Sequence, residues 1–282
     1  ISLTTDAALA TTGDCGSSGN PPTAKWALQV TVPIYGASDL TPSSVNGVFP
    51  CIKAANFASG PGTRPNPILV TRGAGGFRIT SATLAAQPNY ATTLYVQADP
   101  IKGLLFYGNN FTSLKAANQT RKTFYGADVD IFEYRAHVYY IRPCTRALAS
   151  NGQCAASDDA GRPVPTLARQ ELFGAAMTEV PLVEGIERID YRFGIDDRPT
   201  LTSTGTCGVS AHDSDGDSKD KDGQCNDGGK DDGHLVGVTT GTGVPTRFTP
   251  APTATEWPNV VAVKVSVLTR SHTPTPGYDD SG

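Results

Sequence analysis

An acidic segment in the last third of the chain has the residue types and spacing of a cation site. Between residues 213 and 232, eight of twenty residues are aspartate, and glycines interrupt them. Ca²⁺ prefers six to eight oxygen ligands, and glycines let a backbone wrap round the ion. The pattern therefore predicts a calcium site, whose candidate ligands are Asp213, Asp215, Asp217, Asp220, Asp222 and Asp227.

The acidic segment departs from an EF-hand loop at two positions. Counted from Asp213, position six is Ser218, where an EF-hand has glycine, and position twelve is Gln224, where it has glutamate. The segment looks more like the Asp-rich loops of thrombospondin type-3 repeats and other extracellular calcium loops. The alternative interpretation is a solvated acidic loop that binds no ion.

The cysteines indicate an oxidising compartment. Their number is even, and no two are spaced as in a zinc ribbon or a thioredoxin motif. The simplest of the many connectivities pairs them in sequence order, Cys15 with Cys51, Cys144 with Cys154 and Cys207 with Cys225. Six unrelated thiols in a cytosolic protein are the alternative.

No set of residues has the pattern of a catalytic site. The four histidines, His137, His212, His234 and His272, lack metal-site spacing, and no nucleophile elbow occurs. His137 is predicted to be a surface residue or a hydrogen-bonded one. A net charge of −4 argues against a general nucleic-acid-binding face. We therefore expect a protein that is not an enzyme.

The elements that must position these residues are mostly strands. Gly and Pro number 30 and 21, and charged residues make up 18% of the chain, which favours a loop-rich β protein. Apolar and polar residues alternate over 131–141, 189–195 and 260–268, as in half-buried strands. The side chains predicted to lie in the core are Phe132, Tyr134, Val138, Tyr191, Phe193, Val263 and Val265.

Shorter strands are predicted at residues 26–34, 67–72, 77–84, 92–97 and 104–107. Helix signals are weak: a short helix at 167–173 and one helical turn within 183–188. We predict a single β-rich domain over residues 1–282, mainly antiparallel sheet with long loops. The acidic segment is an inserted loop at about residues 205–235.

A series of segments has an order and spacing typical of one family. The segments read Tyr-Tyr-Ile-Arg-Pro-Cys at 139–144, Pro-Thr-Leu-Ala-Arg-Gln-Glu-Leu at 165–172, Leu-Val-Glu-Gly-Ile-Glu-Arg-Ile-Asp-Tyr-Arg-Phe-Gly-Ile-Asp at 182–196, and Trp-Pro-Asn-Val at 257–260. This series resembles the PilW-type minor pilins of bacterial type IV pili, over about residues 24–272. The segment at 182–196, followed much later by Trp-x-Asn-Val, is the most telling part.

The resemblance implies an α+β pilin-like fold, similar to the J-type pseudopilin of type II secretion. In that fold a long N-terminal helix carries a β-rich head. The prepilin segment, with glycine before the cleavage site, Phe-Thr-Leu-x-Glu and an apolar helix, is absent from this sequence. We therefore expect the chain to represent the extracytoplasmic head.

The resemblance also implies a function. It predicts a subunit that assembles with other minor pilins to prime or cap a type IV pilus, with the major pilin and a PilY-type tip adhesin as further partners. The expected location is the pilus tip or the periplasm, with an inner-membrane anchor before assembly. The alternative is a secreted calcium-dependent adhesin or ligand-binding module that uses the 205–235 loop.

Overall fold

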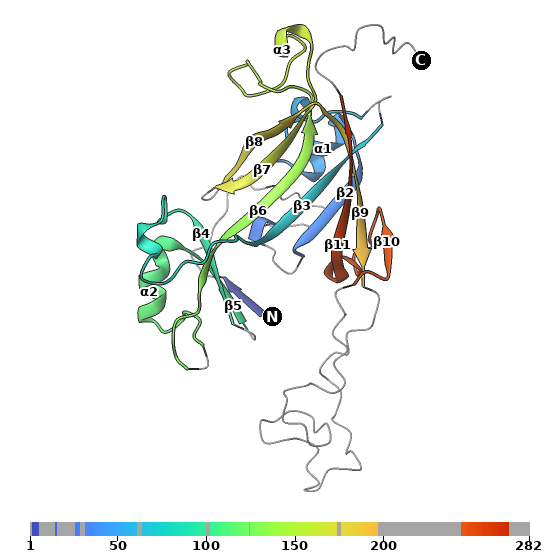
Figure 1. The fold of residues 1–282 in the computed structure, drawn as a ribbon. Helices are drawn as coiled ribbons and strands as arrows, with labels where there is room; N and C mark the ends of the chain where they lie inside the picture. The colour runs from blue at the N-terminus through green and yellow to red at the C-terminus, as the bar shows by residue number, and fades with distance from the viewer. Residues whose placement is uncertain are drawn as a thin grey trace, which may run out of the picture. The chain divides into compact units, whose positions relative to one another are not determined.

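The structure is a computed structural model that describes residues 2–5, 15, 26–28, 32–60, 64–99, 102–123, 125–173, 176–196 and 244–270. Over these residues the chain is mostly antiparallel β-sheet with short helices (Figure 1). This result confirms the predicted β-rich class.

The strands form one eight-stranded and one three-stranded sheet. Their bounds are β1 Ser2–Thr5, β2 Ile34–Leu40, β3 Asn66–Ala74, β4 Leu94–Ala98, β5 Lys102–Tyr107, β6 Ile131–Arg142, β7 Thr166–Phe173, β8 Ala176–Glu184, β9 Ile186–Ile195, β10 Arg247–Thr249 and β11 Val260–Thr269. The α-helices are α1 Pro42–Val48, α2 Phe111–Ala116 and α3 Asp158–Gly161, and 3-10 turns lie at Trp26–Leu28, Ala54–Asn56, Leu84–Ala86, Gly108–Asn110 and Trp257–Asn259.

The long strand β6 connects the parts of the larger sheet. The order is β1-β5-β4-β6-β3-β2, and β7 joins β6 and then β8. Near its start β6 pairs with β4, where Glu133 is opposite Tyr95. Further along, Val138 is opposite both Val70 of β3 and Gln170 of β7. All these pairings are antiparallel, whereas β1 runs parallel to β5.

The core follows the alternation along β6. Tyr134, Ala136, Val138 and Tyr140 are buried, as a strand with one apolar face requires. At the β4–β5 end, the side chains of α2 join those of the strands in one buried cluster, composed of Ile79, Leu84, Tyr95, Leu104, Phe106, Phe111, Leu114 and Ile131.

Four predicted elements are wrong. Residues 26–28 form a 3-10 turn, and β2 begins only at Ile34. Residues 77–84 contain one isolated bridge, Ile79 to Ile131, because Thr80 and Thr83 bond each other and form a turn. The predicted helix at 167–173 is strand β7, and residues 183–188 continue β8 into β9.

The predicted core is correct in part. Tyr134, Val138, Tyr191 and Phe193 are buried. Phe132 and Val263 are half-buried, and Val265 is 50% exposed. Alternation shows which residues share a face of a strand, but it does not show which face another element covers.

The chain divides into two compact units, one with residues up to Tyr191 and from Val265 onward, the other with Arg192 to Lys264. In the second unit, the rings of Phe193 and Trp257 meet edge to face with centroids 4.8 Å apart. In that unit β9 and β10 are antiparallel, with Ile195 opposite Arg247. The single domain over residues 1–282 stays a prediction.

Candidate functional site

The predicted calcium ligands Asp213, Asp215, Asp217, Asp220, Asp222 and Asp227 lie outside the described residues, as do Cys207 and Cys225. The other four cysteines form two disulfides, Cys15–Cys51 and Cys144–Cys154. Both join the cysteines that the sequence-order pairing joins. The third pair and the calcium site stay predictions.

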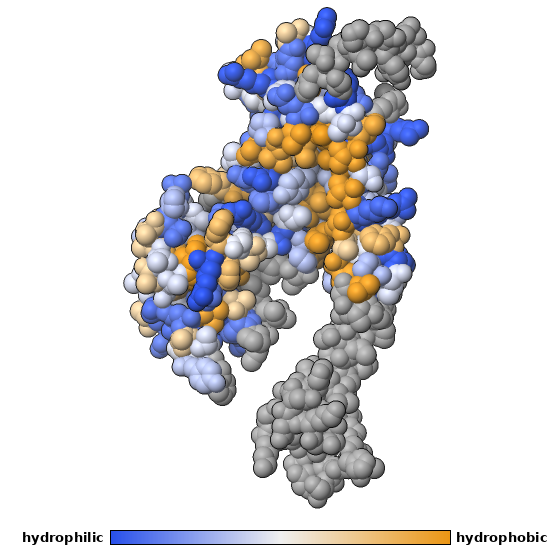
Figure 2. Space-filling model, viewed as in Figure 1, coloured by the Kyte–Doolittle hydropathy of each residue, from blue (hydrophilic) through white to orange (hydrophobic). Residues whose placement is uncertain are grey.

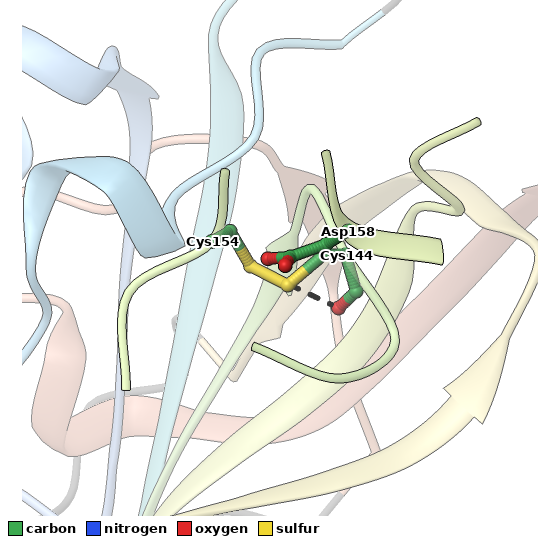
Figure 3. Close-up of side chains that lie close together, drawn as sticks. All are labelled: Cys144, Cys154 and Asp158. Atoms are coloured by element: carbon green, nitrogen blue, oxygen red, sulfur yellow. Dashed lines mark hydrogen bonds between the residues drawn. A yellow bond between two sulfur atoms is a disulfide. The ribbon is translucent and has the colours of Figure 1, made fainter. Parts of the chain in front are cut away.

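The second disulfide lies within the loop of residues 143–165, named here the disulfide loop, which connects β6 and β7. Ligand atoms of Cys144, Cys154 and Asp158 lie within 4.8 Å of one another (Figure 3). Three such groups can hold a metal only if the sulfurs are thiolates. Here the sulfurs are bonded to each other, so this cluster is a disulfide with a carboxylate beside it.

Two aspartates hold the backbone of the disulfide loop. Asp158 is buried, and its carboxylate accepts hydrogen bonds from the backbone N–H groups of Ala155 at 2.8 Å and Leu148 at 3.3 Å. One oxygen of Asp159 accepts from the N–H groups of Thr145 and Val164, both at 2.9 Å. These side chains replace the backbone partners that an irregular loop lacks.

The turn that carries these aspartates is left-handed. Asp159, Ala160 and Gly161 have φ values of 52°, 60° and 76°. This conformation is easy for glycine but costs energy for a residue with a Cβ. The bonds of Asp159 therefore hold the backbone in a conformation that Ala160 does not favour.

Beneath the disulfide loop lies a polar cluster centred on Glu179 of β8. Arg142 donates from Nη1 to Glu179 Oε1 at 2.7 Å, and the Tyr140 hydroxyl donates to Oε2. Burial and then the adjacent carboxylate raise the pKa of Tyr140 well above its usual value, so the phenol keeps its proton and stays a donor. The Gln170 amide donates to the same hydroxyl at 3.3 Å.

Asn56 connects this cluster to the disulfide loop. Its Nδ2 donates to Glu179 Oε2 at 3.1 Å and to the carbonyl of Gly152 at 2.9 Å, and its Oδ1 accepts from the Cys154 N–H at 2.9 Å. On the other side, Arg142 Nη2 lies 3.2 Å from Cys144 Sγ. The loop is thus fastened by a disulfide, by an amide and by a buried guanidinium.

His137 of β6 is half-buried, which agrees with the prediction of a hydrogen-bonded residue. Its Nδ1 lies 3.1 Å from the Tyr139 hydroxyl, and its Nε2 lies 4.0 Å from Glu171. Burial, then the charges of Arg169 and Arg135, lower the pKa of His137 to about 4. The ring is therefore neutral at pH 7, and its Nδ1 can accept a hydrogen bond from the Tyr139 hydroxyl.

The sequence reasoning did not single out Asn56, Asp158 or Glu179. Their roles depend on contacts between segments up to 123 residues apart, as between Asn56 and Glu179. A local signal existed for Asp158 and Asp159 alone, because paired aspartates before a glycine are typical of side-chain-capped turns. The cluster as a whole positions the disulfide loop.

Comparison with known proteins gives one family. Residues 138–282, just over half of the chain, match the family described as Type IV Pilus-assembly protein W. No curated protein and no solved structure matches the chain. Among the helices of the described residues, none is long and apolar enough to cross a membrane. The matched region contains the disulfide loop, the acidic segment and strands β7 to β11.

Proposed function

The chain belongs to the type IV pilus-assembly protein W family, and from this membership we propose that it is a minor pilin. Its family gives it a role in the assembly of type IV pili. The proposal adds that the protein is not an enzyme and assembles with other minor pilins to prime or cap the filament. The family match over residues 138–282 is the observation that carries it.

The described structure supports an assembly role for the head. Its buried polar residues bond to loops and to neighbouring strands, as Glu179 and Asp158 do. Groups arranged in this way hold the disulfide loop in one conformation against the neighbouring strands. The proposed partners are other minor pilins, the major pilin and a PilY-type tip adhesin. The proposed location is the periplasm and then the pilus tip.

The proposed architecture is pilin-like, with an N-terminal helix that precedes this β-rich head and anchors it in the inner membrane before assembly. The gene sequence upstream of Ile1 tests this point. A prepilin segment with Phe-Thr-Leu-x-Glu and an apolar helix is the expected result. A cleavable secretory signal with no such helix would instead favour a secreted adhesin.

Calcium binding by the acidic segment belongs to the same proposal. The strands on either side of the segment, β9 and β10, pair with each other, and the N–H of Thr246 donates to the carbonyl of Ile195 at 2.7 Å. Both ends of the segment therefore leave from one hairpin. An ion bound by Asp213, Asp215, Asp217, Asp220, Asp222 and Asp227 would cancel part of the charge repulsion among them.

Deletion of the gene in the source bacterium tests the assembly role. We expect surface filaments to be lost while the cellular amount of the major pilin is unchanged, and the intact gene to restore the filaments. Electron microscopy of the cells measures the surface filaments, and immunoblots of whole cells measure the amount of the major pilin. Normal filaments in the deletion strain, with calcium-dependent attachment lost, would support the adhesin in place of the minor pilin.

A further inference from the structure

Strand β11 forms an open edge of the three-stranded sheet. The order of this sheet is β10-β9-β11, so β11 has β9 on one side and no described strand on the other. It is ten residues long, contains no proline, and has one charged residue, Lys264. The N–H and C=O groups along such an edge are a template for another strand.

The other sheet edges in the described residues carry features that prevent strand addition. β8 contains Pro181, which has no N–H to donate, and its register with β7 shifts between Leu167 and Ala168. β2 shifts register between Ala37 and Leu40. β1 and β10 have four and three residues. β11 is therefore the long edge that lacks these protections.

The same strand exposes a row of valines. Val261, Val263, Val265 and Val267 alternate and so share one face. Val265 and Val267 are 50% and 51% exposed, and Val261 is 40% exposed. Hydrophobic residues also form an orange band at the surface of Figure 2, where β9 and β11 run in Figure 1. A contiguous apolar patch of this kind marks an interaction surface.

We propose that the open edge of β11 receives an extended strand from another subunit of the pilus complex. This inference rests on the proposed function and names how the protein would contact its partner. The added strand would present apolar residues at every second position, to cover the valines, and a carboxylate facing Lys264. Backbone hydrogen bonds supply affinity in strand addition, and the alternating side chains supply specificity.

Charge favours a different subunit over a second copy or the tail of this chain. Lys264 is exposed and has no ion-pair partner among the described residues. If two copies of β11 paired antiparallel with their valine rows matched, Lys264 of one copy would lie opposite Lys264 of the other. Like charges directly opposite each other are unfavourable. Residues 271–282 contain two prolines and one large apolar residue, Tyr278, so they lack the required alternation.

Two matched substitutions test the proposal in the complete protein, in the gene-deletion strain. Val265→Lys places a charge on the open edge. Val183→Lys makes the same change on β8, at a side chain that is also 50% exposed but lies on the edge that Pro181 protects. Lys264→Glu reverses the charge that the partner is proposed to meet. Thermal midpoints of the purified proteins should be unchanged, because all three sites are exposed.

The readouts are surface filaments and cross-linking from a benzophenone amino acid in place of Ser266. We expect Val265→Lys and Lys264→Glu to reduce both readouts roughly tenfold or more, as the loss of one buried apolar contact implies. Val183→Lys should leave both unchanged. The cross-linked peptide should come from another pilus subunit, alternate apolar and polar residues, and contain Asp or Glu.

Three results would overturn the proposal. Full filament assembly and cross-linking by Val265→Lys would exclude the β11 edge as the contact. A cross-link to a second copy of this chain would exclude the proposed occupant. An equal loss with Val183→Lys would show a nonspecific effect of surface charge. If the deletion strain makes normal filaments, the minor-pilin role itself fails. If the deletion strain lacks filaments and the Val265→Lys variant restores them, only the proposed β11 contact fails.

Discussion

Glu179 is the acceptor on which three donors from two segments converge: Tyr140 and Arg142 from β6 and Asn56 from the turn after α1. The side chain of Arg142 is 5% exposed and that of Glu179 is 18% exposed. A buried ion pair contributes little compared with a well-packed apolar pair. Loss of one partner is costly, however, because the other charge stays buried. The cluster is thus sensitive to single substitutions.

Glu179→Gln should destabilise the protein by about 2–4 kcal/mol, because the Arg142 charge is left uncompensated. The control is Glu133→Gln, which removes an ion pair with Arg135 whose side chains are 44% and 46% exposed. Exposed pairs contribute about 0–1 kcal/mol. Urea unfolding measures both changes. Equal losses of unfolding free energy in the two variants would contradict the assignment of Glu179 to a buried cluster.

His137 should make the fold sensitive to acid above the range in which carboxylates titrate. Its folded pKa is about 4, below the ordinary value of 6.5, so the folded protein binds its proton less readily than the unfolded chain. The stability that this provides is complete above pH 6.5 and is lost as the pH falls towards 4. His137→Gln should therefore show a flatter dependence of the urea midpoint on pH between 6.5 and 4.

A separate group controls the response at lower pH. Hydrogen bonds from Lys115 and Lys122 hold the pKa of the Asp128 carboxyl well below its usual 3.8, so its contribution is lost only below that value. His137→Gln and the unchanged protein should therefore lose stability in parallel below pH 4. Parallel curves over the whole range from 6.5 to 4 would show that His137 is not the responsible group.

At the scale of elements, the disulfide loop contains a left-handed turn, where two substitutions should change the stability of the protein in opposite directions. Ala160 has φ 60° and Gly161 has φ 76°, and a Cβ on Gly161 would meet no atom within 4 Å. Ala160→Gly should stabilise the protein by about 0.5–1 kcal/mol, since the cost of a left-handed alanine exceeds the added entropy of the unfolded chain. Gly161→Ala should destabilise it by about 1–2 kcal/mol. Thermal unfolding of both variants measures the signs, and a loss of stability in Ala160→Gly would contradict the turn.

Long alternating patterns predicted strands well, and short segments gave mixed results. The strands predicted at 67–72, 92–97 and 104–107 are confirmed as β3, β4 and β5, whereas those at 26–34 and 77–84 are wrong. Residues 131–141 lie in β6, because apolar residues at every second position over eleven residues give a strand one apolar face and do not give a helix one. Residues 167–173 have helix-forming Leu, Ala, Arg, Gln and Glu, yet they form β7, since pairing with β6 and β8 outweighs local preference.

The candidate site was less predictable than the strands. Its residues interact only after β6, β7 and β8 are adjacent, as Arg142 and Glu179 show. The valines of β11 show a second limit. The alternation at 260–268 correctly predicted a strand, but its apolar face is exposed at Val265 and Val267. A strand that is completed by a partner has the same pattern as one that is covered by its own chain.

At the scale of the whole molecule, the proposed calcium ligands lie in the chain between two strands, β9 and β10, that pair with each other. Residues 197–243 begin and end at this hairpin, where Arg247 is opposite Ile195. A Ca²⁺ ion there would stabilise the segment and leave the strands as they are. The expected affinity is that of extracellular calcium modules, about 0.1–1 mM.

Titration calorimetry of the complete chain with calcium chloride should therefore show binding heat, and magnesium chloride should show little, because Mg²⁺ demands a more regular site. At a free calcium concentration a hundredfold above the dissociation constant, the ion would stabilise the state that binds it by about 2.7 kcal/mol. The double variant Asp215→Ala with Asp217→Ala should abolish the heat, since each change removes a charged oxygen ligand. Asp39→Ala, at an exposed aspartate of β2, is the control and should bind as the unchanged protein does. Equal heats from the double variant and the control, or no heat from the unchanged protein, would make the segment a solvated acidic loop.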